Sequence, residues 1–231
     1  MKSQLYLPKI MREILKSQIT DYVGIYSQKL LPVFKEIERD ADKHANDFFD
    51  NSMSQPACGD SFDPASFAET ARDEGIDYYL YLSLGKYNLT ATWHATLYQV
   101  WEQQTRRFLF QEISCIHNIP FEKFCTNLSE LKEKFRFHNV DIESFSCWSQ
   151  ISELSLLCNV IKHGEGPSAK ELRKIKPTLF KQEHGTDYMK TFKTTLLEKT
   201  LSIDEKTLQN YSEALLSFWD EILERNYSDE L

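Results

Sequence analysis

The chain has 231 residues, of which 41% are hydrophobic and 27% charged, and its formal net charge is −8 at pH 7. This length can bury a substantial core, and a content of only 7 glycines and 7 prolines favours few, long helices. The acidic balance weighs against a broad nucleic-acid-binding surface. No signal peptide or membrane-length apolar run is visible either, so we expect a soluble, cytoplasmic protein that does not contact a membrane.

The cysteines form no disulfide pattern. There are 5 of them, an odd number without close pairs, so reduced thiols are the simpler interpretation. Cys115, His117 and Cys125 carry side chains of the kind that bind zinc. A second close pair of ligands is missing, however, and helix packing explains each of the three. We therefore expect no metal site and no cofactor.

The N-terminal segment, residues 1–50, is predicted to be a long helix or a pair of helices. Apolar residues recur at intervals of three and four from residue 9 to about residue 49. Pro32 has no amide hydrogen to donate, so it should kink or split the helix near Leu31. We expect residues 64–226 to form the core bundle, with the whole chain folding as a single helical domain.

A connecting loop is predicted over residues 51–63, which are mostly small, polar and turn-forming. Asp63 reads as a helix N-cap and Pro64 as the first helical residue. Two helices should follow, over residues 64–86 and 90–117. The second has an aromatic stripe at helical spacing, which is more often part of a core than a surface on which bases stack.

Two further helices are predicted in the middle of the chain. Pro120 should start a short helix that ends at about residue 135, before a break at Asn139. Asp141 reads as the N-cap of a longer helix ending at His163. Its predicted buried stripe consists of Phe145, Trp148, Ile151, Leu154, Leu157 and Ile161.

The C-terminal third is predicted to hold two more helices. Ser168 should cap a short helix over residues 169–175, which Pro177 stops. Residues 191–201 alternate loosely and fit a short strand or an extended arm, and a final amphipathic helix covers residues 203–225. The sequence therefore predicts an all-α bundle of six to eight helices, with one small extended element near residues 191–201.

A polar helix end is the feature that points most clearly to chemistry. Asn159 and His163 are four residues apart, so they share one face of the predicted helix. Gly164 follows where a helix C-cap needs a left-handed residue, and Pro167 keeps the helix from resuming. The negative pole of the helix dipole favours a protonated histidine here. An alternative is purely structural: His163 satisfies the free carbonyl groups, and Asn159 bonds across helices in the core.

Basic residues are concentrated just after this helix end. Between residues 162 and 181 there are six basic side chains against two acidic ones, a local charge of +4 beside the histidine. The basic residues are Lys162, Lys170, Arg173, Lys174, Lys176 and Lys181.

Arg106 and Arg107 form a second candidate phosphate contact. Two guanidinium groups on an aromatic helix could clamp a phosphate. Glu102 lies four residues before Arg106, so an ordinary ion pair within the helix is the alternative.

The segment Cys-Asn-Val-Ile-Lys-His-Gly, residues 158–164, resembles the HEPN superfamily of small helical bacterial proteins. The signature of that family is an Arg, often followed by Asn, and then a His four to six residues later near a helix end. Asn159 and His163 match the Asn and the His, while Cys158 stands where the Arg is expected. The resemblance implies a metal-independent ribonuclease of toxin–antitoxin or phage-defence systems, in which two motifs meet across a homodimer interface.

The resemblance implies a role for each candidate residue. His163 would act as acid or base while an RNA 2′-hydroxyl attacks the adjacent phosphate, and Asn159 would orient it. Since Cys158 cannot supply a cation, Lys162 with Arg106 or Arg107 would contact the phosphate. The neighbouring residues Lys170, Arg173 and Lys174 would hold the RNA backbone.

A second hypothesis belongs to a different class. Having lost the Arg, the chain could be a non-catalytic helical module that binds a partner protein encoded nearby or regulates an associated nuclease. RNA cleavage that depends on His163 would separate the two hypotheses.

Overall fold

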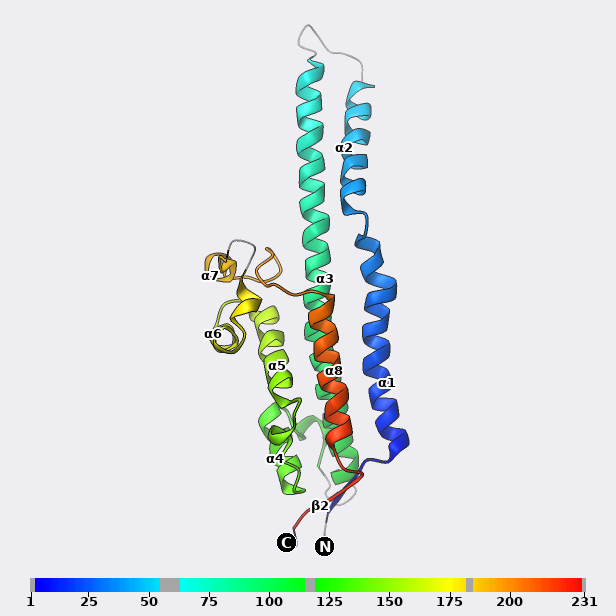
Figure 1. Cartoon of the computed structure of the whole chain (residues 1–231), viewed down its shortest axis with the longest axis vertical. Coiled ribbons are helices and arrows are strands. Elements are labelled where there is room, and N and C mark those ends of the chain that lie inside the picture. Colours follow the sequence, from blue (N-terminus) through cyan, green and yellow to red (C-terminus); the bar gives the residue numbers. More distant parts are fainter. Residues whose placement is uncertain (1–2, 55–62, 115–118, 182–184, 230–231) are drawn as a thin grey trace.

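A computed structural model describes residues 3–54, 63–114, 119–181 and 185–229. The molecule is an elongated helical bundle with a long two-helix projection at one end (Figure 1). The predicted all-α fold is confirmed, and the described residues contain eight α-helices. These are α1 (Lys9–Ile25), α2 (Ile37–Met53), α3 (Pro64–Ser114), α4 (Leu128–Phe137), α5 (Trp148–His163), α6 (Pro167–Ile175), α7 (Tyr188–Phe192) and α8 (Glu205–Glu221). None of them is long and apolar enough to cross a membrane.

The predicted break near Leu31 is confirmed. After α1 the backbone forms a π-helical turn, Tyr26–Leu30, and then a 3-10 turn, Leu31–Phe34. Pro32 lies in the 3-10 turn, where its missing amide hydrogen removes a donor that a continuing α-helix would need. The chain then enters α2, so the N-terminal segment is a pair of helices.

Helix α3 is the longest element, with 51 residues. Its predicted start is confirmed, because Pro64 is its first residue and the Asp63 carboxylate accepts a hydrogen bond from the amide of Ala65 at 2.9 Å. The predicted division into two helices is wrong. No proline interrupts this stretch, and Tyr87 is buried in the core at the expected break, so the helix continues. The expected loop before Asp63 falls mostly on residues 55–62, outside the described residues.

Helix α3 belongs to two parts of the molecule. Its first half pairs with α2 in an antiparallel hairpin, which we call the projecting hairpin (Figure 1). Small residues allow the two helices to approach closely. A Cβ atom added at Gly75 would lie 2.9 Å from Cβ of Ala45 and 3.4 Å from the carbonyl oxygen of Ala41.

The second half of α3 packs with α1, α5 and α8 in what we call the body. Aromatic rings fill its centre: Trp101 meets Phe218 edge to face at 5.0 Å, and Phe108 meets Trp219 at 6.0 Å between ring centroids. All four side chains are at most 1% exposed. The predicted aromatic core stripe is therefore confirmed. Helix α1 lies in the body and α2 in the projecting hairpin, so the two helices of the N-terminal segment belong to different parts of the molecule.

The helix predicted to start at Pro120 starts later. Only a 3-10 turn, Phe121–Lys123, follows that proline, and α4 begins after Asn127. The Asn127 side chain accepts a hydrogen bond from the amide of Glu130 at 3.0 Å, which is the capping interaction that fixes the start of the helix.

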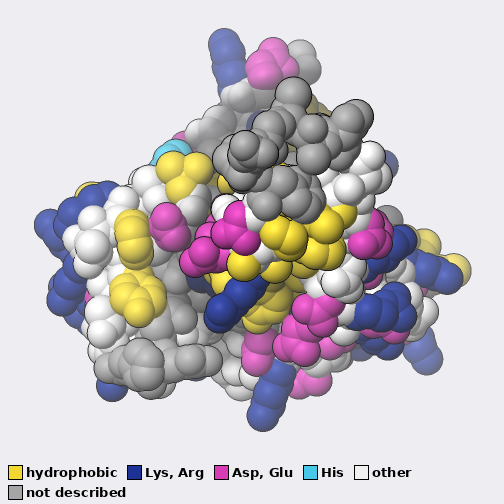
Figure 2. Space-filling model, turned by 90° about the horizontal axis from the view of Figure 1, so that it is seen from above, with side chains coloured by type: hydrophobic (Ala, Val, Ile, Leu, Met, Phe, Trp, Pro, Cys, Tyr) yellow, Lys and Arg dark blue, Asp and Glu magenta, His cyan; other side chains and the backbone are white. Residues whose placement is uncertain are grey.

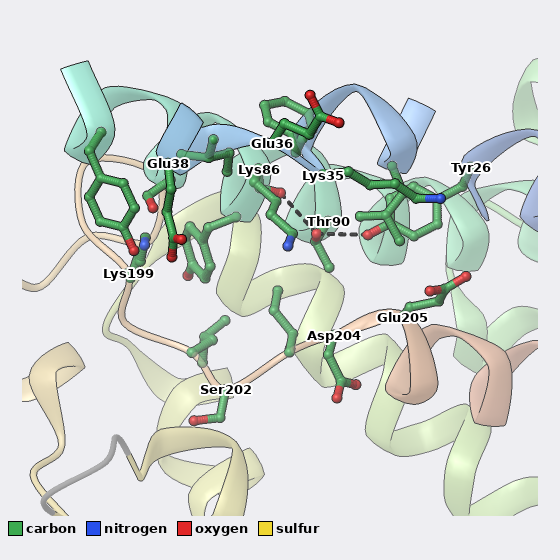
Figure 3. Close-up of a pocket in the computed structure, with 18 of the residues that line it drawn as sticks. Tyr26, Lys35, Glu36, Glu38, Lys86, Thr90, Lys199, Ser202, Asp204 and Glu205 are labelled. Atoms are coloured by element: carbon green, nitrogen blue, oxygen red, sulfur yellow. Dashed lines mark hydrogen bonds between the residues drawn. The ribbon is translucent and has the colours of Figure 1, made fainter. Parts of the chain in front are cut away.

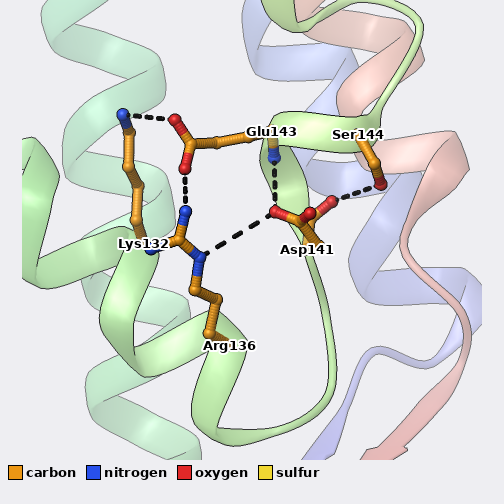
Figure 4. Close-up of polar contacts among 5 residues, drawn as sticks. All are labelled: Lys132, Arg136, Asp141, Glu143 and Ser144. Carbon is orange, nitrogen blue, oxygen red and sulfur yellow. Dashed lines mark hydrogen bonds and ion pairs between the residues drawn. The ribbon is translucent and has the colours of Figure 1, made fainter.

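Asp141 caps a short turn instead of α5. It accepts a hydrogen bond from the amide of Glu143 at 3.2 Å and begins the 3-10 turn Ile142–Ser144, whereas α5 begins at Trp148. Figure 4 shows how side chains hold this turn: the Glu143 carboxylate accepts hydrogen bonds from Lys132, at 2.8 Å, and from Arg136, both on α4. The Lys132 bond is the main reason that the pKa of Glu143 lies below its usual value.

The C-terminal segments differ from the prediction in detail. Helix α6 begins at Pro167, with Gly166 at the N-cap position, so Ser168 lies inside the first turn. The described residues contain no strand within 191–201. A two-stranded antiparallel sheet instead joins the two ends of the chain, from β1 (Gln4–Tyr6) and β2 (Arg225–Tyr227).

Candidate functional site

The candidate site is the C-terminal end of α5, which the sequence predicts correctly. The buried stripe anchors this helix, since Ile151, Leu154 and Leu157 are all 0% exposed. Gly164 ends it with φ of +70°, and its amide donates to the carbonyl oxygen of Val160 at 2.8 Å. The last turn of α5 therefore has a fixed position relative to the core.

A single segment of chain closes over this helix end. The hydroxyl group of Thr195 donates to the carbonyl oxygen of Ile161 at 2.7 Å. The amide of Glu165 donates to the carbonyl oxygen of Lys193 at 3.0 Å. A Cβ atom at Gly164 would lie 2.2 Å from the carbonyl oxygen of Lys193. Only glycine fits here, and Lys193, far along the chain, is placed beside the end of α5.

His163 is exposed and is not needed as a cap. Gly164 and Thr195 already supply donors to carbonyl groups of the last turn. Within the described part of the chain the imidazole has no hydrogen-bond or ion-pair partner. Asn159, one turn earlier on the same face, is half-buried and also makes no side-chain hydrogen bond among the described residues. Both side chains are thus free to engage a ligand.

Cys158, at the position of the expected Arg, faces the core. It is 1% exposed, and its Sγ atom lies 3.5 Å from the carbonyl oxygen of Ala95 on α3. Burial raises the pKa of this thiol, and the neighbouring ammonium group of Lys162 partly opposes the rise. The ammonium group of Lys162 therefore lies close to the Cys158 thiol.

Arg106 has a structural role in the loop after α3. Its Nε donates to the carbonyl oxygen of Phe124 at 2.7 Å, and its Nη2 donates to that of Phe121 at 2.6 Å. The guanidinium carbon also lies 4.3 Å from the centroid of the Phe121 ring. The alternative ion pair with Glu102 is not formed, because Glu102 instead accepts a hydrogen bond from the hydroxyl group of Tyr98 at 3.2 Å.

The structure does not bring Arg106 and Arg107 to His163. Helices α3 and α5 run in opposite directions (Figure 1), and Cys158 contacts Ala95, so His163 lies at about the level of Thr90 on α3. Arg106 is 16 positions further along α3, which at 1.5 Å per residue is about 24 Å away. Arg107 is exposed and borders a groove between α1 and α3.

Arg173 is an internal clamp and not a free cation. It donates to Glu165 at 2.7 Å and to Asp187 at 2.7 Å, and its guanidinium carbon lies 4.4 Å from the ring centroid of Phe180. The bond to Glu165 is the main reason that the pKa of Arg173 is raised. The arginine thus neutralises both acids and ties α6 to the segments on either side of it.

Several lysines remain unpaired around this clamp. The segment 162–193 has eight Lys or Arg and four Asp or Glu, a local charge of +4 on a chain of net charge −8. We call this region the basic lobe. Seen from above, Lys and Arg side chains gather at the left margin of the molecule (Figure 2), the side on which α6 and α7 lie in Figure 1.

The lysines of the basic lobe that the sequence predicts as RNA contacts differ in whether they already form an ion pair. Lys174 pairs with Glu171 at 2.8 Å on the surface, whereas Lys170 is exposed and makes no ion pair among the described residues. The sequence analysis missed Lys190 and Lys193, which are also exposed and unpaired within that part of the chain. Extending the local charge count past residue 181 would have found them.

The described residues hold no group of three or more His, Cys, Asp or Glu side chains arranged to bind a metal ion. Cys125 is buried, and burial raises the pKa of its thiol to about 11. Cys115 and His117 lie outside the described residues.

Comparison with protein-family models, curated proteins and solved structures finds no match for this chain. The functional argument therefore depends on the geometry of the site.

Proposed function

We propose that this chain is a HEPN-like, RNA-directed cytoplasmic protein of bacterial toxin or phage-defence type, and that it cleaves RNA at the exposed end of α5 without a metal ion. The observation that supports this most strongly is the exposed imidazole of His163, which has no partner among the described residues and lies next to a basic lobe within an acidic chain. A structural histidine at a helix end would be engaged with the carbonyl groups, which Gly164 and Thr195 satisfy instead.

The basic lobe provides the binding energy for RNA. Lys162, Lys170 and Lys193 are exposed and free of ion pairs within the described residues, so phosphate groups can approach them without displacing a carboxylate. Such contacts release counterions from the nucleic acid and depend strongly on salt. Arg173 supports the lobe from within and does not contact the phosphate.

The proposed reaction is an internal transesterification. His163 accepts the proton of a ribose 2′-hydroxyl, and the 2′-oxygen forms a bond to the adjacent phosphorus. The bond from phosphorus to the 5′-oxygen breaks, and that oxygen takes up a proton, leaving a 2′,3′-cyclic phosphate and a 5′-hydroxyl. Imidazole is suited to this proton transfer because it titrates near neutral pH.

Asn159 and Lys162 complete the site. The amide of Asn159 lies one turn before His163 on the same face, from where it orients the imidazole. The cation of Lys162 stabilises the negative charge that grows on the phosphate, the role that an Arg plays in the family motif. Lys193, held beside the end of α5 by the Gly164 contact, supplies a second cation.

Cleavage is tested with labelled single-stranded RNA in EDTA. The wild type should release fragments that end in 2′,3′-cyclic phosphate, and His163→Ala should be at least about 100-fold slower because it lacks the proton acceptor. His44→Ala is the matched control, since His44 lies on α2 and stacks on Tyr78. It should cleave like the wild type. Equal rates for wild type and His163→Ala would remove His163 from the mechanism.

RNA binding is tested separately by fluorescence anisotropy. The double variant Lys170→Glu/Lys190→Glu should bind RNA at least tenfold more weakly, with a shallower dependence on salt, because it makes fewer phosphate contacts. Lys9→Glu/Lys43→Glu carries the same change in net charge on exposed lysines of α1 and α2, and should bind like the wild type. Equal weakening by both pairs would mean that net charge, and not the basic lobe, governs binding.

A second candidate function is that of a non-catalytic interaction module. It is favoured by the projecting hairpin, where Ile76, Leu80 and Tyr81 are 47%, 54% and 72% exposed. A second copy of the chain could cover these side chains by pairing two hairpins into a four-helix bundle. Light scattering after gel filtration should then show a dimer, and Leu80→Glu/Tyr81→Glu a monomer. A wild type that is monomeric at all concentrations would exclude this arrangement.

A further inference from the structure

A pocket of about 950 Å³ lies where the projecting hairpin meets the body. It is bordered by the break between α1 and α2, by the middle of α3 and by the segment 199–205 that leads into α8 (Figure 3). It is distinct from the end of α5, because neither His163 nor Lys162 lines it. The volume is within the usual range for pockets that hold small organic ligands.

Aromatic side chains make up much of the wall of this pocket. Tyr26, Phe34, Tyr79 and Tyr87 all line it. Tyr26 is fixed by a hydrogen bond of 2.8 Å between its hydroxyl group and that of Thr90. Tyr26 and Tyr87 are buried beneath this wall, at 0% and 8% exposed, so Phe34 and Tyr79, which is 39% exposed, provide the stacking surface for a planar heterocycle.

Two lysines from different elements reach the same pocket. Lys86 comes from α3 and Lys199 from the segment before α8, and neither has an ion-pair partner among the described residues. Burial lowers the pKa of Lys199, and the positive charge of Lys86 lowers it further. Both side chains line this one pocket (Figure 3), so an anion bound there can contact both ammonium groups.

Acidic groups lie at other positions around the pocket. Glu36 is paired with Arg39, and Asp204 accepts a hydrogen bond of 2.7 Å from the amide of Thr207 as the N-cap of α8. Glu38 makes no ion pair among the described residues and extends from α2 into the same space as Lys86 (Figure 3). Its carboxylate can accept hydrogen bonds from a hydroxyl or amino group.

We propose that this pocket binds a nucleoside phosphate, with the phosphate between Lys86 and Lys199 and the base against the tyrosine-lined wall. A phosphate ion alone would leave most of the volume and the aromatic surface unfilled. A neutral nucleoside would offer no charged group to Lys86 and Lys199, which make no ion pair among the described residues. Glu38 and Asp204 then face the sugar hydroxyl groups or the amino group of the base.

Isothermal titration calorimetry with AMP, GMP, CMP and UMP and their triphosphates tests this proposal, with the parent nucleosides and inorganic phosphate as separate arms. At least one nucleotide should bind, and its nucleoside and phosphate alone should each bind at least tenfold more weakly. Lys86→Gln and Lys199→Gln should each weaken the nucleotide by at least tenfold. Lys43→Gln, at an exposed lysine of α2 that does not line the pocket, is the matched control and should have no effect.

The proposal is overturned if no nucleotide of the panel binds, or if binding is unchanged in both Lys86→Gln and Lys199→Gln. Both lysines are exposed, and unchanged circular dichroism will confirm that the variants fold. RNA cleavage by the two variants should remain at the wild-type level, because the pocket does not include the end of α5. The nucleotide-binding proposal and the RNA-cleavage proposal can therefore fail independently, and the two assays show which of them has failed.

Discussion

At the scale of single residues, Gly164 shows how one backbone angle determines the candidate site. Its φ of +70° turns the chain away from α5, and its missing side chain leaves room for the carbonyl group of Lys193. The same contact brings a lysine from beyond α7 to the end of α5. A glycine that the sequence marks as a helix cap thus also brings the backbone of Lys193 against the end of α5.

Gly164→Ala should therefore destabilise the fold. The added Cβ would lie 2.2 Å from a backbone oxygen and would occupy a conformation that side chains rarely adopt, so we expect a loss of about 2–4 kcal/mol in the free energy of unfolding. Urea denaturation measures it. Gly166→Ala is the control, since a Cβ there meets nothing within 4 Å, and it should change stability by less than about 1 kcal/mol. Similar losses in both variants would contradict the steric argument.

His94, unlike the exposed His163, is buried in the core. Its side chain is 0% exposed, and its Nδ1 lies 2.8 Å from the carbonyl oxygen of Thr90, while its Nε2 has no hydrogen-bond partner in the part of the chain that the structure describes. Burial lowers its pKa from 6.5 to about 4, although the Thr90 bond and the charge of Asp204 oppose this. The imidazole therefore remains neutral inside the body, where it packs edge-on against Tyr211 at 5.9 Å.

The free energy of unfolding should consequently fall as the pH falls from about 6.5 to 4. In that window the unfolded chain binds a proton at His94 that the folded chain does not, so each pH unit lowers stability by up to about 1.4 kcal/mol from this group. Urea denaturation at pH 7, 6 and 5 tests this. His94→Gln should flatten the slope and His44→Ala should keep it. The same slope in wild type and His94→Gln would show that other groups cause the dependence.

At the scale of elements, α3 combines two kinds of packing in one helix. In the projecting hairpin it contacts α2 through small residues, and in the body it buries aromatic rings. Glycine is unfavourable in a helix relative to alanine, so a glycine within α3 needs a reason. At Gly75 the reason is the close approach of α2, whereas a Cβ at Gly85 would make only an ordinary contact of 3.6 Å with Phe34.

These two glycines should respond in opposite directions. Gly75→Leu should separate α2 from α3 and lower the melting temperature, because the new side chain overlaps Ala45. Gly85→Ala should raise stability by about 0.5–1 kcal/mol through helix propensity. Differential scanning calorimetry distinguishes the two changes. A Gly75→Leu protein as stable as the wild type would mean that the hairpin tolerates a wider spacing than we describe.

At the scale of the whole molecule, stability and charge are both unevenly distributed. The aromatic core lies in the body, whereas α2 contributes only Ala41 as a fully buried side chain. The chain is acidic overall, but the basic lobe gathers positive charge on one side. A positively charged binding surface can thus occur on a protein whose net charge is negative.

Hydrogen exchange should reveal a gradient along α3. Amides of residues 66–80 should exchange through local opening of the projecting hairpin, and amides of residues 95–113 only through unfolding of the body. Mass spectrometry of peptides from the two ends of the same helix measures this difference. Uniform protection along α3 would show that hairpin and body unfold together.

Much of the fold is predictable from local sequence. Pro32 divides the first helix pair, Asp63 and Pro64 start α3, and Gly164 ends α5, because each of these residues constrains its own backbone. The boundaries that failed have separate causes, since the start of α4 is a local cap that the prediction passed over and the others depend on packing. No local breaker was present between residues 86 and 90, and the turns before α4 and α5 are held by Asn127 and by contacts of Glu143 with α4.

The sequence by itself determined that the chain is helical, that α5 ends at a histidine, and that basic residues follow, since periodicity, capping and local charge are encoded along the chain. Only the tertiary structure decided which of the candidate cations are occupied by structural contacts. In the folded chain Arg106 and Arg173 make structural contacts. Cys158 faces the core, and Lys193 lies beside Gly164. Side chains far apart in sequence meet through packing, and no local pattern specifies that choice.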